Sequence, residues 1–146
     1  MKRFYRVQAD IDLSAIRKNI ETMHGCIPKG KKMLVVLKAN AYGHGAIEIA
    51  RELDDLSDYY GVACIEEGIE LRKAGIVKPI LILGHTDESQ FEELVTYDIT
   101  QTVFSYAQAK VLSDISGKLG KTGKLHIKLD TGMNRIGYPC TGESVE

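Results

Sequence analysis

The sequence lacks an excess of either charge: its formal net charge is −1, and no stretch concentrates lysine and arginine. Proteins that bind nucleic acid or an anionic membrane carry a basic patch, so both kinds of partner are excluded. Long apolar runs are also lacking, since Met33–Leu37 and Ile80–Leu83 are far too short to cross a bilayer. No apolar segment of signal-peptide length follows the basic residues 1–6. We therefore expect a soluble, cytoplasmic protein.

Cysteine is scarce and widely spaced, at Cys26, Cys64 and Cys140, with no Cys-x-x-Cys pair. This spacing excludes a disulfide framework and a zinc site. Cys64 lies in the apolar segment Tyr60–Ile65, so we expect a small buried hydrophobe rather than a reactive thiol. The histidines lack the spacing of metal ligands, and no metal site is predicted.

The Gly-x-Gly-x-x-Gly fingerprint and the phosphate-binding P-loop are both absent, so nothing favours a nucleotide-binding sheet. What the sequence does contain is a regular alternation of short apolar segments and amphipathic ones. The short segments predict strands at Met33–Ala39, Tyr60–Ile65, Pro79–Gly84, Thr100–Phe104 and Leu125–Asp130. The amphipathic segments predict helices at Ala46–Leu53, Glu66–Ala74, Glu88–Val95 and Ser105–Leu119. Gly75 and Gly120 follow two of these helices and predict their ends.

A further strand is expected at Val7–Leu13, followed by a helix that Ser14 caps. Short connections between alternating strands and helices imply an α/β fold with a parallel sheet. Two architectures fit, a doubly wound open sheet and a partial (β/α)8 barrel. A complete barrel needs roughly 250 residues, so in the second case this chain supplies about the first five barrel strands and is a fragment.

Lys38 is the first candidate for chemistry, because it ends a strand that is otherwise apolar. Desolvation lowers the pKa of a lysine and makes its amine nucleophilic, as Schiff-base chemistry requires. The simple alternative is a lysine at the end of a strand that extends into solvent. The loop that follows carries Asn40, Tyr42 and the glycines of Gly43–Gly45, at the end of the strand where α/β folds place active sites. The Tyr42 phenol can reach a ligand phosphate or oxygen.

The segment Leu125–Asp130 is the second candidate. Its alternation places Leu125, Ile127 and Leu129 on one face, to pack against helices, and His126, Lys128 and Asp130 on the other. In a barrel the second face is the interior, whereas in an open sheet it is the wet face of an edge strand. Arg135 follows in a loop, and its guanidinium is well suited to a carboxylate or phenolate.

Three blocks carry a resemblance to one family. Val36–Gly45 (VLKANAYGHG) looks like the cofactor-lysine signature of the alanine racemases. Lys128–Gly137 (KLDTGMNRIG) resembles their second characteristic block, and Ala9–Ile16 (ADIDLSAI) with Asn19 is similar to their beginning. The resemblance implies a (β/α)8 barrel followed by a β-rich domain, in an enzyme that uses pyridoxal 5'-phosphate and acts as a homodimer. Residues 1–146 would be the N-terminal portion of that barrel, without the C-terminal β domain.

The same resemblance implies roles for particular residues. Lys38 forms the internal aldimine with the cofactor and exchanges the α-proton on the D-alanine side. Tyr42 bonds the cofactor phosphate, and Arg135 lies near the cofactor phenolate and the substrate. Lys128 matches a lysine that is carbamylated in some members and that positions Arg135. The second base, a tyrosine of the partner subunit, falls outside this sequence, so we expect half of a two-base site that does not racemise alanine efficiently.

Other functions fit parts of the pattern. A serine or broad-spectrum amino-acid racemase shares both blocks. A non-catalytic protein that binds pyridoxal phosphate is disfavoured by residues 41–45, which such proteins usually lack. An inactive, truncated chain held together through its open sheet edges is the remaining alternative. The leading expectation is a racemase that interconverts L-alanine and D-alanine, which supplies D-alanine for the cell wall.

Overall fold

A computed structural model of the chain describes residues 7–140, so the basic residues 1–6 lie outside it. Five strands form one sheet: β1 (Leu34–Val36), β2 (Tyr59–Val62), β3 (Ile80–Ile82), β4 (Thr100–Val103) and β5 (Leu125–Ile127). The five predicted strands from Met33 onward are therefore present, each shorter than its apolar segment. Strand length is set by the hydrogen-bonded ladder, whereas the apolar segment also includes the residues that lead into each loop.

All four pairings within this sheet are parallel, and the strands lie in the order β1-β2-β3-β4-β5. A doubly wound sheet reverses its strand order at a switch point. No reversal occurs here, so the sheet is wound in one direction, as in a barrel. The predicted α/β class with a parallel sheet is confirmed, and the strand order decides between the two architectures that fit the sequence.

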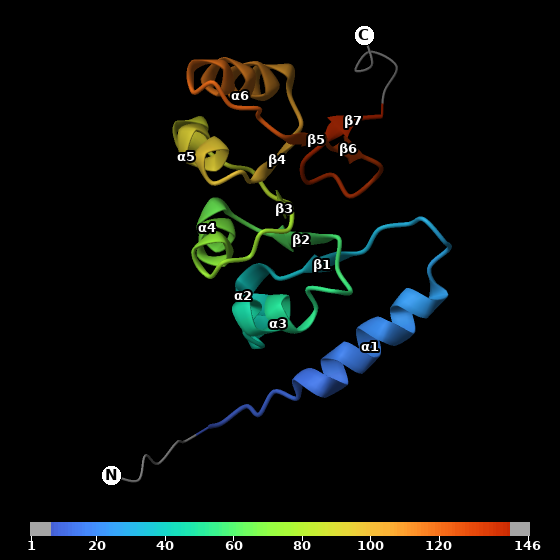
Figure 1. The fold of residues 1–146 in the computed structure, drawn as a ribbon. Helices are drawn as coiled ribbons and strands as arrows, with labels where there is room; N and C mark the ends of the chain where they lie inside the picture. The colour runs from blue at the N-terminus through green and yellow to red at the C-terminus, as the bar shows by residue number, and fades with distance from the viewer. Residues whose placement is uncertain (1–6, 141–146) are drawn as a thin grey trace.

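The helices follow the strands in turn and stand on one side of the sheet (Figure 1). They are α2 (Lys38–Gly43), α3 (Ala46–Glu52), α4 (Ile65–Lys73), the 3₁₀ turn η1 (Glu88–Gln90), α5 (Phe91–Thr96) and α6 (Tyr106–Lys118). Gly75 and Gly120 take φ angles of +88° and +61° just beyond α4 and α6, as the sequence predicted. None of the described helices combines the length and hydropathy that a membrane crossing requires.

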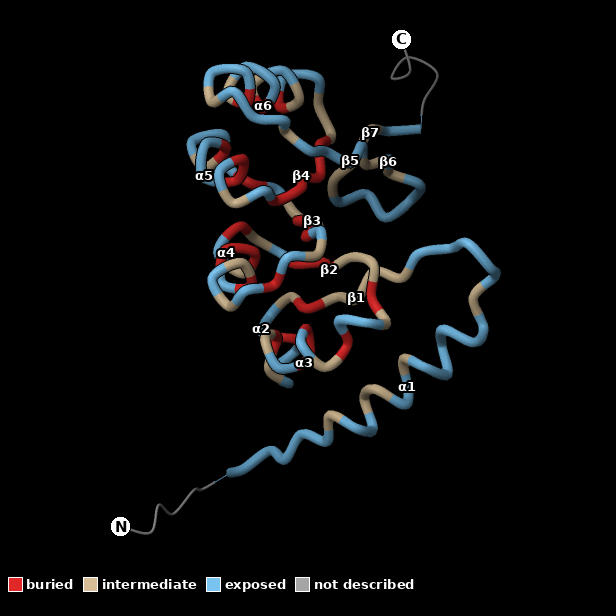
Figure 2. The backbone as a smooth tube through the Cα atoms, viewed as in Figure 1, coloured by how far each residue is buried: buried red, intermediate tan, exposed pale blue. Residues whose placement is uncertain are grey.

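The hydrophobic core fills the space between the sheet and these helices (Figure 2). Tyr60 of β2 and Ile80 and Ile82 of the central strand β3 are completely buried. Tyr60 also satisfies its hydroxyl inside the core, since its O–H donates to the carbonyl of Ala50 over 2.6 Å. Burial of a phenol is tolerated when its polar end finds such an acceptor, so α3 is fixed to β2 by both packing and a hydrogen bond.

The sheet is strongly curved. His126 of β5 lies against Tyr59 of β2, with ring centroids 6.0 Å apart, although β3 and β4 separate their strands. In a flat sheet, strands three positions apart are separated by about 14 Å. The contact therefore requires the sheet to curl, with His126 on its concave side. This is the side that the sequence assigned to a barrel interior.

The N-terminal segment corrects two predictions. Val7–Leu13 is not a strand: residues 7–12 have no regular structure, and α1 extends from Leu13 to Cys26. The apolar alternation found no neighbouring strand to pair with, and a strand without a partner is not stable. The helix cap is Asp12 rather than Ser14, because the Asp12 carboxylate accepts the N–H of Ala15. Arg17 ties α1 to the end of α3 and the turn after it by donating to the Glu52 carbonyl and the Asp55 carboxylate.

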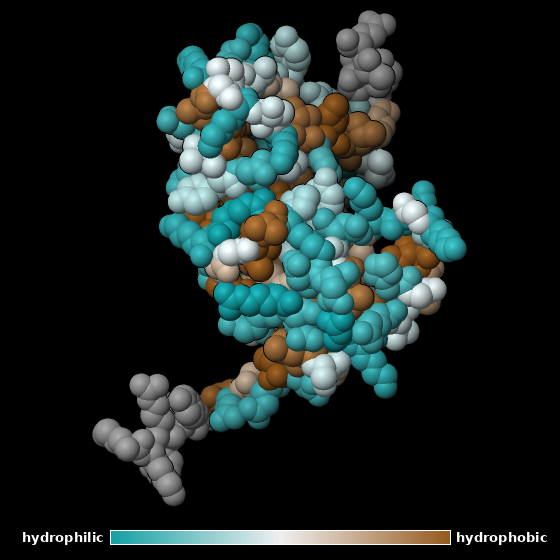
Figure 3. Space-filling view, viewed as in Figure 1, coloured by the Kyte–Doolittle hydropathy of each residue, from teal (hydrophilic) through white to brown (hydrophobic). Residues whose placement is uncertain are grey.

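The last predicted strand, Leu125–Asp130, is interrupted at Lys128. Its second part, β6 (Leu129–Asp130), leaves the sheet and pairs with β7 (Tyr138–Pro139). Leu125, Ile127 and Leu129 do not pack under helices as predicted, being 39%, 66% and 59% exposed. β5 is an edge strand, and no described helix follows it to cover this face. Figure 3 shows the hydrophobic surface that results over β5 to β7.

Two isoleucines on parallel strands provide a matched test of this core. Ile82 is fully buried and Ile127 is 66% exposed. We expect Ile82→Ala to lower the free energy of unfolding by about 2–5 kcal/mol, because it leaves a cavity. Ile127→Ala should change it by less than about 1 kcal/mol. Urea unfolding followed by circular dichroism measures both, and equal losses would contradict the assignment of β5 as an uncovered edge.

Candidate functional site

A cleft of about 280 Å³ lies where the parallel strands end. Each of the first three strands contributes to it, and a loop after β5 completes it. Its lining residues are Lys38, Ala63, Leu83, Gly84, His85, Arg135 and Ile136. The structure thus brings together Lys38 and Arg135, the two cationic residues that the sequence singled out from segments almost a hundred positions apart. The volume is at the lower end of ligand pockets, roughly 300 Å³.

Lys38 begins a turn of unusual backbone conformation. The four residues after it, Ala39 to Tyr42, all have φ angles between +52° and +56°, which is the left-handed region. For residues other than glycine this conformation costs roughly 1–2 kcal/mol each. The sequence predicted an extended strand up to Ala39, so this turn corrects that boundary. Such strain persists only where the surroundings impose it, and it concentrates at functional sites.

Glu67 of α4 is one of the contacts that hold this turn. One carboxylate oxygen accepts the N–H of Ala39 and the other accepts the N–H of Ala63, both over 2.7 Å. Ala39 follows β1 and Ala63 follows β2, so a single side chain joins the ends of two neighbouring strands. Hydrogen bonds to a carboxylate are stronger than those between neutral groups. Sequence reasoning missed Glu67, since nothing in the pattern shows that its helix faces these amides.

Within the turn, polar side chains satisfy the backbone. The Asn40 side-chain oxygen accepts the N–H of Ala46 over 2.8 Å and so caps α3. Tyr42 projects into solvent, 62% exposed, and its ring centroid lies 5.8 Å from the Lys38 amine. The amine therefore stands beside the ring face, at the distance of a cation–π contact. Tyr42 is near Lys38 but is not among the described residues that line the cleft.

Arg135 is presented by a loop that wraps around the carboxylate of Asp130. One oxygen of Asp130 accepts the N–H groups of Gly132 and Asn134, each over 3.0 Å. These backbone bonds hold the pKa of Asp130 below its usual range, and the nearby charge of Lys128 acts in the same direction. His126, Lys128 and Asp130, which the sequence placed on one face, therefore do not act as one group. His126 lies on the concave face, whereas Asp130 shapes the loop that carries Arg135.

Lys128 and Cys64, both considered from the sequence, are not among the described residues that line the cleft. Lys128 is half-buried where β5 ends, and its backbone N–H donates to Val103. Cys64 is half-buried, not buried, at the start of α4. Burial raises the pKa of its thiol, which keeps it protonated and unreactive.

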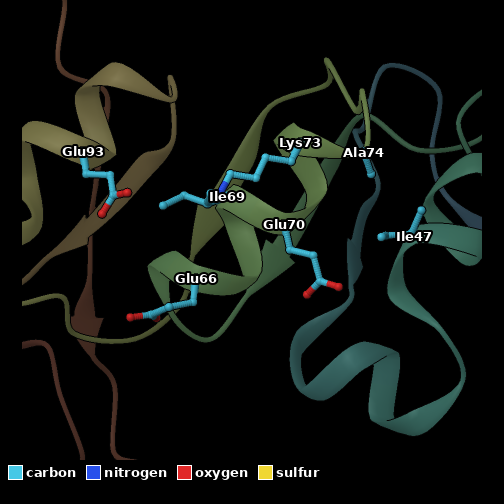
Figure 4. A pocket seen from close by; sticks show the side chains of 7 residues that line it. All are labelled: Ile47, Glu66, Ile69, Glu70, Lys73, Ala74 and Glu93. Atoms are coloured by element: carbon cyan, nitrogen blue, oxygen red, sulfur yellow. The ribbon is translucent and has the colours of Figure 1, made fainter.

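The cleft is distinguished from other hollows by its charge. Its lining contains a lysine, an arginine and a histidine, and among residues 7–140 no acidic side chain belongs to it. A larger hollow on the outer helical layer, of about 610 Å³, has the opposite character (Figure 4). Three of its lining residues are acidic, Glu66 and Glu70 from α4 and Glu93 from α5. Anionic ligands are therefore favoured in the cleft at the strand ends and disfavoured between these helices.

Comparison with known proteins identifies the family. The model of the family described as "Alanine racemase, N-terminal domain" matches residues 11–146. This chain belongs to that family. An alanine racemase of Geobacter sulfurreducens is 46% identical over 132 residues, which cover 90% of this chain and 35% of the relative. The resemblance proposed from the sequence is thereby confirmed.

Solved structures of racemases agree with this family assignment. An alanine racemase of Clostridium difficile 630 superposes with a TM-score of 0.89 at 41% identity, covering 92% of this chain and 35% of that one. A histidine racemase of Leuconostoc mesenteroides subsp. sake superposes with a TM-score of 0.78 at 30% identity, covering 87% and 34%. The five strands with their helices thus fit a partial (β/α)8 barrel, as predicted. The chain spans about a third of the length of the relatives it matches.

The bridging role of Glu67 can be tested with one neutral substitution. In Glu67→Gln one oxygen is replaced by an NH2 group that cannot accept, so one strand-end amide loses its partner. We expect the free energy of unfolding to fall by about 1–3 kcal/mol and amide exchange to accelerate at whichever of Ala39 and Ala63 loses its acceptor. Glu70→Gln, exposed on the same helix, should change stability by less than about 0.5 kcal/mol. Unaltered exchange at both amides would contradict the bridge.

The Asp130 loop gives a pH-dependent prediction. A carboxylate whose pKa is lowered by folding stabilises the fold above its unfolded pKa, and this contribution is lost as the pH falls through the folded pKa. We therefore expect the amide signals of Gly132 and Asn134 to move together in NMR spectra as the pH is lowered below the usual range of an aspartate. In Asp130→Asn the movement should vanish. Titration of the Asp130 carboxyl at an ordinary aspartate pKa would overturn this account.

Proposed function

We propose that this chain contains the cofactor-binding half of a pyridoxal 5'-phosphate-dependent alanine racemase, which interconverts L-alanine and D-alanine. The observation that carries the proposal is the convergence of Lys38 and Arg135 in one cleft at the strand ends. Residues 1–146 would form the N-terminal portion of its (β/α)8 barrel. The relatives and solved structures named alanine racemase support this activity, while the share of their length covered here leaves the rest of the site to other segments.

The cleft fits a small anionic aldehyde. Lys38 provides a primary amine and Arg135 a planar set of donors, and none of the described residues that line the cleft is acidic. Lys38 would bind the aldehyde carbon, and Tyr42 would turn its phenol toward the phosphate. Arg135 would pair with the phenolate oxygen and with the substrate carboxylate, because its donors match planar anions. A carbamate on Lys128 would provide the anionic partner that orients Arg135.

Proton movement then follows from the position of Lys38. Pyridoxal phosphate, when bound there, would supply an electron sink that acidifies the α-proton of the amino acid. The Lys38 amine would remove or return that proton on the D-alanine side, as a base held close to the carbon. A tyrosine of a partner subunit would act on the opposite face in a homodimer. We further propose a cytoplasmic location and a role in supplying D-alanine.

A broader racemase is the second candidate. The likeness to a histidine racemase shows that this fold also occurs in a protein named for another amino acid. Lys38 and Arg135 would act on groups that every α-amino acid shares, so neither distinguishes alanine from a larger substrate. Amino-acid racemisation in general is therefore supported by the same cleft, with alanine favoured by the number of relatives that carry its name.

Reductive capture of the cofactor tests the proposal. The purified chain is mixed with pyridoxal phosphate, borohydride is added to make the lysine–aldehyde bond permanent, and the labelled peptide is found by mass spectrometry. We expect label confined to Lys38 and absent in Lys38→Arg, which keeps the charge without a primary amine.

Lys32→Arg is the matched control for this capture. The Lys32 amine also lies 5.8 Å from a tyrosine ring centroid, but at the opposite end of β1. Labelling at Lys38 should be unchanged in this variant. Label scattered over surface lysines, or none, would mean that this chain does not assemble the cofactor site.

A further inference from the structure

His85 lines the cleft beside Lys38 and Arg135, yet neither the sequence pattern nor the proposed mechanism uses it. It follows β3 in the loop that begins at Gly84. Its ring lies edge-on to Phe104, with centroids 5.8 Å apart. It is exposed on its remaining side. Nothing in the packing of the core therefore requires an imidazole at this position.

A buried glutamine fixes the orientation of this imidazole. The side-chain oxygen of Gln108 accepts the backbone N–H of Phe104 over 3.3 Å, and its nitrogen lies 2.9 Å from Nδ1 of His85. A backbone N–H can only donate, so the amide oxygen faces it and the NH2 group faces His85. Nδ1 must then accept, which places the proton of the neutral ring on Nε2.

A second buried glutamine holds the same loop from behind. Gln101 of β4 is fully buried, and its side-chain N–H donates to the carbonyl of Gly84 over 3.1 Å. Gly84 is also pressed against β2, because a Cβ at this position would lie 2.6 Å from the carbonyl oxygen of Ala63. Burying two polar amides is costly unless each is hydrogen-bonded. Both amides donate to the Gly84–His85 segment and so fix its position, although the side-chain oxygen of Gln101 accepts no hydrogen bond from the described residues.

We propose that His85 is a ligand-contacting residue of the cleft, whose Nε2–H donates to an anionic oxygen of the molecule that Lys38 and Arg135 bind. The inference rests on the proposed function of the cleft as a site for a phosphorylated aldehyde and a carboxylated amine. A phosphate and a carboxylate are the two sources of such an oxygen. The nearest acid along the loop, Asp87, is occupied by the N–H and hydroxyl of Ser89, and the part of the lining that the structure describes contains no acid.

The tautomer is the first measurement. Histidine ¹⁵N NMR of the full chain at about pH 8.5, where imidazoles are neutral, should show the proton of His85 on Nε2. In Gln108→Glu a carboxylate faces Nδ1 and accepts from it, so the proton should move to Nδ1. His24, exposed on α1, serves as an internal reference and should not respond. A proton on Nδ1 in the unsubstituted chain would overturn the inference.

Ligand titration is the second measurement. The ¹⁵N signal of His85 should shift in a saturable way with pyridoxal phosphate. A similar response to inorganic phosphate would assign the contact to a phosphate group, and a response to acetate alone would assign it to a carboxylate. His85→Ala should weaken the binding of pyridoxal phosphate about ten- to a hundredfold, as expected for a hydrogen bond to a charged group. His24→Ala is the matched control and should leave binding unchanged.

The outcomes separate this inference from the proposed function. Capture of the cofactor at Lys38 with a silent His85 signal and unchanged affinity in His85→Ala would overturn the inference alone. A His85 signal that responds to phosphate or acetate, without capture at Lys38, would sustain the anion contact and remove the cofactor site. Because the titration uses the unsubstituted chain, a failure of His85→Ala to fold would not affect it.

Discussion

The carboxylate of Glu67 is the contact on which the geometry of the cleft depends. It joins the amides that follow β1 and β2, and so holds four left-handed residues in place after Lys38. Backbone bonds inside the turn and Asn40, whose side-chain oxygen accepts the first N–H of α3, hold it as well. The position of the Lys38 amine is thus fixed by contacts beyond its own strand.

The architecture could be predicted from the sequence because buried strands and helices each give a regular spacing of apolar residues. Short apolar segments such as Pro79–Gly84 alternate with amphipathic ones through short connections, and this alternation predicts a parallel sheet with helices. The same reasoning failed at Val7–Leu13, where the alternation was present but no neighbouring strand was available. It also failed at Ala39–Tyr42, since alanine and tyrosine give no local sign of a left-handed turn. Both errors concern structure that other parts of the chain impose.

The candidate site, like the fold, was predicted only in part from the sequence. Lys38 and Arg135 stood out because each follows a strand and carries a charge that is costly to bury. Glu67, Gln101 and Gln108 gave no such sign, since a polar residue on a helix or a strand usually faces solvent. Their importance arises from register: only the folded sheet brings their oxygens and nitrogens to particular amides, carbonyls and rings. His85 was considered as a metal ligand alone, and its neighbours in space suggest a different use.

The curvature of the sheet has a mechanical consequence. Lys38 follows the first strand in the sheet and Arg135 follows the last, so only the curl that brings Tyr59 against His126 allows both to line one cleft. The distance between Lys38 and Arg135 therefore depends on the curvature of the five-stranded sheet. A ligand that contacts both cations would be sensitive to that curvature.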